Sequence, residues 1–295
     1  MKKTVNSLLG GLALLALSST ASAQFGGGDP WPDMKKLLVV ADVQTGYHHD
    51  SINHAMGVIE QLGRESGEWV TFLRTDSQLI TKEEIMGQGT RYGGRRVNAK
   101  NLDFFDGVFL IGAGEGTLDE EQKEALLSFV RDDGKSVILG HAGSIFWYEW
   151  EDYQHMVGSF MQSEFSGDAE YIRESSTFPG ATAYPETFVL NDQPAVWMDY
   201  FSSDDAEVIL RVDPSNLSER NRERRPDGDL PQVFAKYYGE GRVFNNALGH
   251  NEELWDDPSF RELMTEGIKW ALGATEYELS YPNMAEDRAI GSDGQ

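Results

Sequence analysis

Short apolar runs alternate with amphipathic helical patterns through the first half of the chain. Lys36 to Val43 is an apolar run of strand length, as expected of a strand buried on both faces of a sheet. Apolar residues between positions 52 and 62 then recur at helical spacing. The two patterns return as strands at Trp69 to Arg74, Phe105 to Ile111 and Ser136 to Leu139, and as a helix at Asp119 to Val130. This alternation predicts an α/β fold of three layers, with helices on both faces of a mostly parallel sheet.

The second half of the chain changes character. Its extended runs are short and separated by Pro, Asp and Ser; they lie at Phe188 to Leu190, Ala195 to Met198 and Val208 to Val212. Gln232 to Tyr238 and Arg242 to Leu248 flank a glycine turn, which is a hairpin signal. These patterns predict antiparallel additions to the sheet, followed by a final amphipathic helix at Pro258 to Leu272.

Two segments rich in arginine are predicted to be exposed. Met86 to Lys100 combines Gly with Arg and should form a long loop. Asn216 to Asp229 carries four arginines flanked by acids, which favours a solvated loop over an anion site.

The amino terminus predicts export. Met1 to Ala23 has the charged start, short apolar run and small-residue end of a Sec signal peptide. We therefore expect a periplasmic or extracellular protein with a flexible lead at 24–34, one domain at 35–275 and a polar, partly disordered tail at 276–295. No later stretch approaches the roughly 20 apolar residues that span a bilayer, so no membrane insertion is expected.

Composition excludes several classes of chemistry. The chain has no cysteine, which rules out disulfides, thiolate metal sites and the nucleophile of an ordinary glutamine amidotransferase. Its formal charge is −24, or −26 once Lys2 and Lys3 leave with the signal peptide. Such a surface repels nucleic acid and anionic membranes and favours a neutral or cationic partner, with a homo-oligomer as one option.

Three histidines follow predicted strands. His49 and Asp50 come after the first strand, His141 after the strand ending at Leu139, and His250 after the last strand. Because ligands bind beyond the carboxyl ends of such strands, the imidazoles could share one crevice and hold zinc or a similar divalent ion. With His141 on a sharp elbow, acid–base catalysis involving His49 and Asp50 is the alternative chemistry. The competing interpretations are a helix-capping Asp50 and structural histidines.

Further candidates suit a sugar ligand. Trp150, Tyr153 and Tyr148 cluster just after His141, and aromatic faces stack on sugar rings, although core packing would explain them equally well. Glu115 lies in a glycine-rich loop after another strand, where backbone can approach a ligand closely. A plain tight connection is the alternative for that loop.

Several motifs resemble the ThuA-like, or trehalose-utilisation, family between Lys35 and Gly273. They are YHHDSI at 47–52, LDEEQ at 118–122, GHA at 140–142, WEDYQHMVGSF at 150–160, GRVFNNALGH at 241–250 and WDDPSF at 255–260. The resemblance implies a flavodoxin-like sheet of the class I glutamine amidotransferase type, with histidine at the elbow in place of cysteine. It also implies work on trehalose, related disaccharides or 3-keto-sugars. The matching site positions are His49, Asp50, His141 and His250, with Trp150 and Tyr153 beside them.

The chain departs from this family pattern at three places. Gln162-Ser163-Glu164 and Phe178-Pro179 stand where many relatives have His-Pro pairs, and Asp192-Gln193 replaces an expected Asp-Glu. These departures predict altered specificity or lost activity. The leading hypothesis is an exported carbohydrate-active enzyme; the alternatives are a non-catalytic carbohydrate-binding protein and a metal-dependent hydrolase of non-sugar substrates.

Overall fold

The computed structural model describes residues 29–98 and 100–291. The predicted signal peptide, residues 24–28 of the lead and residues 292–295 of the tail lie outside the described residues. The chain divides into two units, Met1–Pro32 and Asp33–Gln295, and the second contains every strand of the sheet. Among the described helices, none is long and apolar enough to cross a membrane.

A nine-stranded sheet with a parallel and an antiparallel half forms the framework. Across the parallel half the order is β2 (Trp69–Arg74), β1 (Lys35–Val40), β3 (Gly107–Leu110), β4 (Ser136–Gly140) and β11 (Gly241–Asn246). It continues in antiparallel pairing through β10 (Pro231–Tyr238), β9 (Glu207–Val212), β6 (Gly167–Arg173) and β7 (Thr187–Asp192). The predicted α/β class, with a parallel core and antiparallel additions in the second half, is confirmed.

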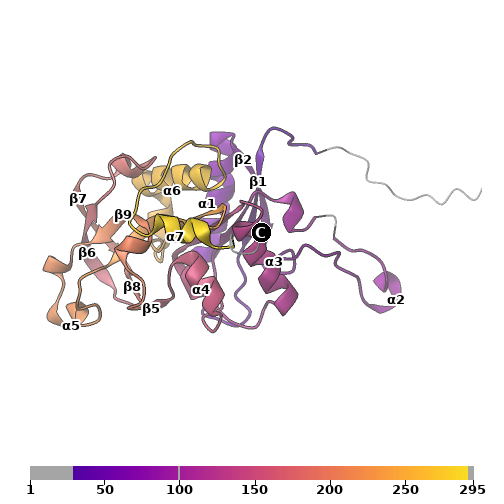
Figure 1. The fold of residues 1–295 in the computed structure, drawn as a ribbon, viewed down its shortest axis with the longest axis horizontal. Helices are drawn as coiled ribbons and strands as arrows, with labels where there is room; N and C mark the ends of the chain where they lie inside the picture. The colour runs from indigo at the N-terminus through magenta and orange to yellow at the C-terminus, as the bar shows by residue number, and fades with distance from the viewer. Residues whose placement is uncertain (1–28, 99, 292–295) are drawn as a thin grey trace, which may run out of the picture. The chain divides into compact units, whose positions relative to one another are not determined.

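Helices cover both faces of the parallel half (Figure 1). Side chains of a strand alternate between faces, and β1 accordingly sends Leu37 and Val39 to one core and Leu38 and Val40 to the other. The first core also contains residues of α1 (Ser51–Ser66) and α6 (Pro258–Ala271), and the second contains residues of α3 (Glu120–Arg131) and α4 (Glu151–Val157). The three-layer arrangement follows from this burial of both faces.

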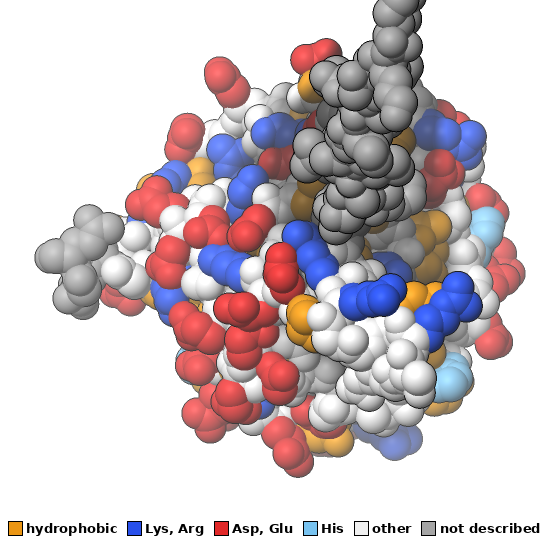
Figure 2. Space-filling view, turned by 90° about the vertical axis from the view of Figure 1, so that its right-hand side faces the viewer, with side chains coloured by type: hydrophobic (Ala, Val, Ile, Leu, Met, Phe, Trp, Pro, Cys, Tyr) orange, Lys and Arg blue, Asp and Glu red, His pale blue; other side chains and the backbone are white. Residues whose placement is uncertain are grey.

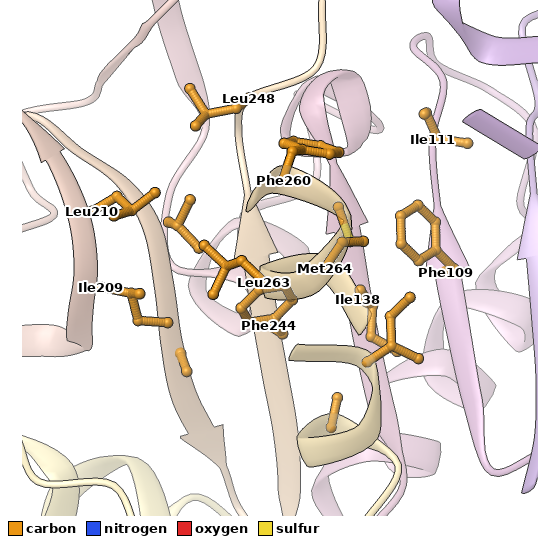
Figure 3. Packing of buried hydrophobic residues seen from close by; sticks show 14 of the residues in the cluster. Phe109, Ile111, Ile138, Ile209, Leu210, Phe244, Leu248, Phe260, Leu263 and Met264 are labelled. Carbon is orange, nitrogen blue, oxygen red and sulfur yellow. The ribbon is translucent and has the colours of Figure 1, made fainter. Parts of the chain in front are cut away.

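Close packing fixes α6 on the sheet. Figure 3 shows Leu263 and Met264 of α6 against Phe244 of β11, with Phe109 of β3 beside them. A Cβ atom added at Gly267 would lie 2.3 Å from the Phe244 ring, so only glycine permits this approach. The helix begins where Asp257 accepts hydrogen bonds from the amides of Ser259 and Phe260.

Two strands of the second half were not predicted. They are β5 (Met161–Glu164), which pairs with β8 (Ala195–Trp197) in a separate two-stranded sheet, and β6. In β6 the buried residues are Ala169 and Tyr171, so an alternating pattern was present but short.

The prediction of a solvated arginine loop at 216–229 was wrong for Arg225. A short helix, α5 (Glu219–Arg222), is exposed, but the Arg225 side chain is only 4 % exposed. Its guanidinium donates hydrogen bonds to the carbonyls of Trp197, Met198 and Phe201 and pairs with Asp227. Burial of a charge is tolerated here because each of the three guanidinium nitrogens donates to an acceptor.

The segment predicted as a polar tail contains a helix, α7 (Met284–Ala289), which packs on β10. The carboxylate of Asp287 lies 3.0 Å from the buried ammonium of Lys236 and accepts a 2.8 Å hydrogen bond from Tyr281. These contacts join residues 276–291 to the domain core.

Candidate functional site

The site lies where β1, β4 and β11 end. His49 follows β1 and precedes α1, His141 is the first residue after β4, and His250 follows β11 in the turn before α6. The three strands run parallel, so their carboxyl ends share one edge of the sheet. The loops therefore meet although they are far apart in the sequence.

The three imidazoles converge, as predicted. One ring nitrogen from each of His49, His141 and His250 lies within 4.8 Å of the others. The ring centroids are 5.0 to 5.3 Å apart, and each pair of rings is nearly perpendicular. His49 and His141 are buried and His250 is half-buried, so the cluster forms the floor of a recess.

His141 is held in one orientation by its backbone and by one hydrogen bond. Its φ of 25° lies in the left-handed region, which is the sharp elbow predicted after β4. Its Nδ1 lies 2.8 Å from the carbonyl oxygen of Ala247, and a carbonyl can only accept, so Nδ1 carries the proton. The lone pair is therefore on Nε2, where it can bind a metal or accept a proton.

A buried carboxylate positions His250. The two oxygens of Asp192 accept hydrogen bonds from the amides of Gly249 (2.7 Å) and Asn251 (3.1 Å), on either side of the histidine. The imidazole Nδ1 also lies 3.2 Å from Oδ1 of Asn251. Burial raises the pKa of Asp192, while these amides act in the opposite direction. Asp192 is a positioning residue because it acts through the backbone of its neighbours.

The environment keeps the buried histidines neutral at neutral pH. Burial, followed by the nearby His141 and His250, lowers the pKa of His49 to about 3. Burial lowers the pKa of His141 to about 4, partly opposed by its hydrogen bond to Ala247. Neutral imidazole is the form that coordinates metals.

The donor set fits a divalent ion. Three nitrogens bound to one zinc at about 2.1 Å lie about 3.4 Å apart in tetrahedral geometry, so nitrogens that are now up to 4.8 Å apart would move closer by up to about 1.4 Å when a metal binds. Nδ1 of His49 is buried and makes no hydrogen bond of normal geometry with the described residues. A buried ring nitrogen without a partner is costly unless something else binds it. Three imidazoles with an open fourth position are typical of a catalytic zinc site.

A pocket of about 560 Å³ opens above the cluster. Its lining consists of Tyr47, His49, Ile145, Met161, Ser163, Glu164, Ser166, Gln193 and His250. An oxygen of Glu164 lies 3.9 Å from Nε2 of His141, and burial raises the pKa of the Glu164 carboxyl group. Ser163, Glu164 and Gln193 are among the departures from the family pattern. These three positions therefore form part of the pocket wall, a role that their sequence context alone did not reveal.

A smaller hollow of about 220 Å³ adjoins this pocket. It shares Tyr47, His49 and His250 and adds Asp50, Asn251, Glu252 and Glu253. Asp50 lies at the start of α1 without a capping hydrogen bond from its side chain, so the capping interpretation is not what the structure shows. Tyr47 is 69 % exposed at the mouth of both recesses, and sequence reasoning did not single it out.

The predicted sugar-binding residues lie elsewhere. Trp150 and Tyr153 stack on each other at 5.6 Å inside the core, and the Tyr153 hydroxyl donates a 2.7 Å hydrogen bond to the Gly143 carbonyl behind the elbow. Tyr148 is 49 % exposed. Glu115 accepts a hydrogen bond from the Glu149 amide, and burial raises its pKa. None of these four residues lines the pocket above the histidines.

Comparisons with known proteins agree with the fold. Residues 36–271 match the ThuA family, described as trehalose utilisation. A ThuA-like protein from Parabacteroides merdae ATCC 43184 shares 15 % identity, with 84 % of this chain and 92 % of that chain covered and a TM-score of 0.59. One from Bacteroides uniformis ATCC 8492 also shares 15 % identity, covering 83 % and 94 % of the two chains at a TM-score of 0.61. No curated protein matches the sequence. Because the family match spans most of the chain, this protein belongs to the ThuA family.

Proposed function

We propose that this protein is an exported enzyme that acts on a neutral sugar, such as a disaccharide, a glycoside or a 3-keto-sugar derivative. The observation that carries the proposal is the group of three histidines, two of them buried, below an open pocket, in a chain of a family linked to trehalose utilisation. Neutral imidazoles at the base of a recess are a feature of reaction centres more than of packing cores.

The pocket wall favours a neutral ligand. It offers hydroxyls from Ser163 and Ser166, an amide from Gln193 and a carboxylate from Glu164, all of which can hydrogen-bond sugar hydroxyls. Neither Lys nor Arg occurs among the residues that line the pocket or the adjoining hollow. A phosphate or carboxylate on the sugar would therefore find no Lys or Arg in these walls and would face Glu164. The exposed ring of Tyr47 provides a stacking surface at the mouth.

We assign the three histidines to metal binding and Glu164 to proton transfer. His49, His141 and His250 would hold the ion, which supplies Lewis-acid polarisation of a sugar oxygen and a lowered pKa for bound water. Nε2 of His141 is kept available by the bond from Nδ1 to Ala247. The oxygen of Glu164 that lies near this nitrogen can accept a proton from a sugar hydroxyl at the reacting centre.

Metal content and activity of matched variants test the proposal. The purified protein should contain nearly one equivalent of metal by elemental mass spectrometry, and His49→Ala, His141→Ala and His250→Ala should each remove it. His48→Ala is the matched control, because His48 is the exposed neighbour of His49 and should keep the metal.

Turnover of neutral disaccharides, glycosides and 3-keto-sugars should follow the metal content, and sugar phosphates and uronates should be poor substrates. Saturable sugar binding without turnover would replace the enzyme with a carbohydrate-binding protein. Metal-dependent hydrolysis of simple esters, without any sugar binding, would refute the assignment to carbohydrates.

A further inference from the structure

The segment predicted as a loop at 86–100 forms an ordered projection, which we call the basic arm and define as residues 85–97. Its two sides are joined by backbone hydrogen bonds of 2.8 Å, from Gly87 to Arg95 and from Val97 to Ile85. The tip carries the short helix α2 (Gly89–Tyr92), which stands apart from the layers of the fold (Figure 1). Binding residues are carried disproportionately on surface loops of this kind.

The arm exposes apolar and cationic side chains together. Met86, Tyr92 and Val97 are each about half exposed, and every residue from 88 to 97 is exposed. Large exposed apolar side chains gathered on one projection are typical of interaction surfaces. The arm therefore presents contact area that the described part of the chain does not cover.

The charge of the arm is opposite to that of the molecule. Arg91, Arg95 and Arg96 lie in a stretch without any acid, on a chain of formal charge −24. Of these three arginines, only Arg96 forms an ion pair with another described residue. Its partner is Glu84, at 3.2 Å. Figure 2 faces the right-hand end of Figure 1, to which the arm projects, and shows Lys and Arg side chains gathered near the centre with Asp and Glu dominating the left.

A complementary feature is the acidic rim, which we define as Asp50, Glu252 and Glu253. These three exposed carboxylates surround the smaller hollow beside His49 and His250, and none has a Lys or Arg partner within the described residues. The arm follows the carboxyl end of β2, and the rim follows those of β1 and β11. The arm lies within the connection from β2 to β3, whose base is joined to α3 by a hydrogen bond from Lys82 to Ser128.

We infer that two copies of this chain associate through a two-fold contact in which the basic arm of each copy docks on the acidic rim of the other. The contact is reciprocal, so two arm-to-rim pairings form at once and the interface closes on itself. A second copy supplies the opposite charge locally, because it carries the acidic rim, whose carboxylates have no Lys or Arg partner among the described residues. Each arm would then border the mouth of the partner's sugar pocket.

Charge reversal on each side tests the docking. The arm variant is Arg91→Glu with Arg95→Glu, and the rim variant is Glu252→Arg with Glu253→Arg. The wild-type protein should be a dimer by sedimentation velocity at low salt, and the dimer should weaken at about 1 M salt, where charges are screened beyond about 3 Å. Each variant alone should dissociate at least tenfold more readily, because like charges then face each other across both contacts.

Mixing the two variants is the decisive measurement. In an equal mixture the acidic arm meets the basic rim and the basic arm meets the acidic rim, so a heterodimer should form with close to wild-type affinity. Arg64→Glu with Arg220→Glu, two exposed arginines outside the arm, is the matched control and should stay dimeric. Circular dichroism of each variant verifies the fold.

A monomeric wild-type protein at low salt would overturn the inference, as would an arm variant that dimerises like wild type. Retention of monomeric wild-type protein on a polyanion, lost in the arm variant, would reassign the arm to an anionic polymer. The mass measurement requires neither metal nor sugar, so its failure would leave the proposed enzymatic function untouched.

Discussion

Acid should unfold this protein unusually early because of its two buried histidines. An unfolded histidine has a pKa near 6.5, whereas the folded pKa is about 3 for His49 and about 4 for His141. Below pH 6.5 the unfolded state therefore binds protons that the folded state does not bind. The stabilisation is fully present above about pH 6.5 and is lost as the pH falls toward the two folded values.

The size of this loss of stability depends little on the folded-state pKa values of the two histidines. At about pH 5 an unfolded histidine is almost fully protonated, and a folded one with a pKa of 4 or below is mostly neutral. Lowering the pH from about 7 to about 5 should therefore reduce the free energy of unfolding by about 2 kcal/mol for each of His49 and His141, or about 4 kcal/mol for the pair.

Urea unfolding of the metal-free protein measures this effect. Tryptophan fluorescence, followed across the pH range in the presence of a chelator, gives the free energy of unfolding at each pH. A double variant, His49→Gln with His141→Gln, cannot take up these protons, and the remaining titrating groups cancel in the comparison with wild type. The control is His48→Gln with His155→Gln, which alters two exposed histidines and should behave as wild type. Parallel pH profiles for wild type and the His49/His141 variant would refute the reasoning.

Asp192→Asn should weaken zinc binding by about 10- to 100-fold, because its carboxylate fixes the amides on either side of His250; competition with a coloured chelator measures this, and unchanged affinity would remove its positioning role. Arg225→Ala should lower the free energy of unfolding by about 3–5 kcal/mol, since buried carbonyls lose their donor. Exposed Arg220→Ala, measured in the same urea titration, should change it by less than about 0.5 kcal/mol. Gly267→Ala should cost about 1–3 kcal/mol because the added methyl overlaps a packed ring; an unchanged unfolding midpoint would mean that α6 can shift freely.

The parallel half of the fold could be predicted from the sequence because each element has a strong local pattern. β2 was predicted with its observed bounds, Trp69–Arg74, and β3 and β4 within two residues at each end. β3 and β4 are buried on both faces, so they appear as apolar runs, whereas the edge strand β2 was recognised by its β-branched and aromatic residues. The short edge strands of the other half carry fewer buried residues, and β5 has only Met161 fully buried. Such segments depend on partners that are remote in the sequence.

The candidate site could be predicted in part because its histidines follow strands with strong local patterns. The positions of His49, His141 and His250 after strands indicated that they could meet, and the strand order made them meet. Glu164 was visible only as a departure from a family pattern, because β5 had no clear strand signal. Trp150 and Tyr153 had an ambiguous sequence context, and the core contacts that surround them come from elements distant in the chain.

Because of the position of β11, the three-histidine cluster can form only after nearly the whole chain has been synthesised. This strand lies between β4 and β10 and is the junction of the two halves of the sheet, yet it is the last strand in the chain. A nascent chain that ends before residue 241 already carries two of the three imidazoles but has neither the junction nor the carbonyl of Ala247 that orients His141. Pairings of such long sequence separation form late in folding. The three-histidine cluster should therefore arise only with the fully assembled sheet, and incomplete chains should lack it.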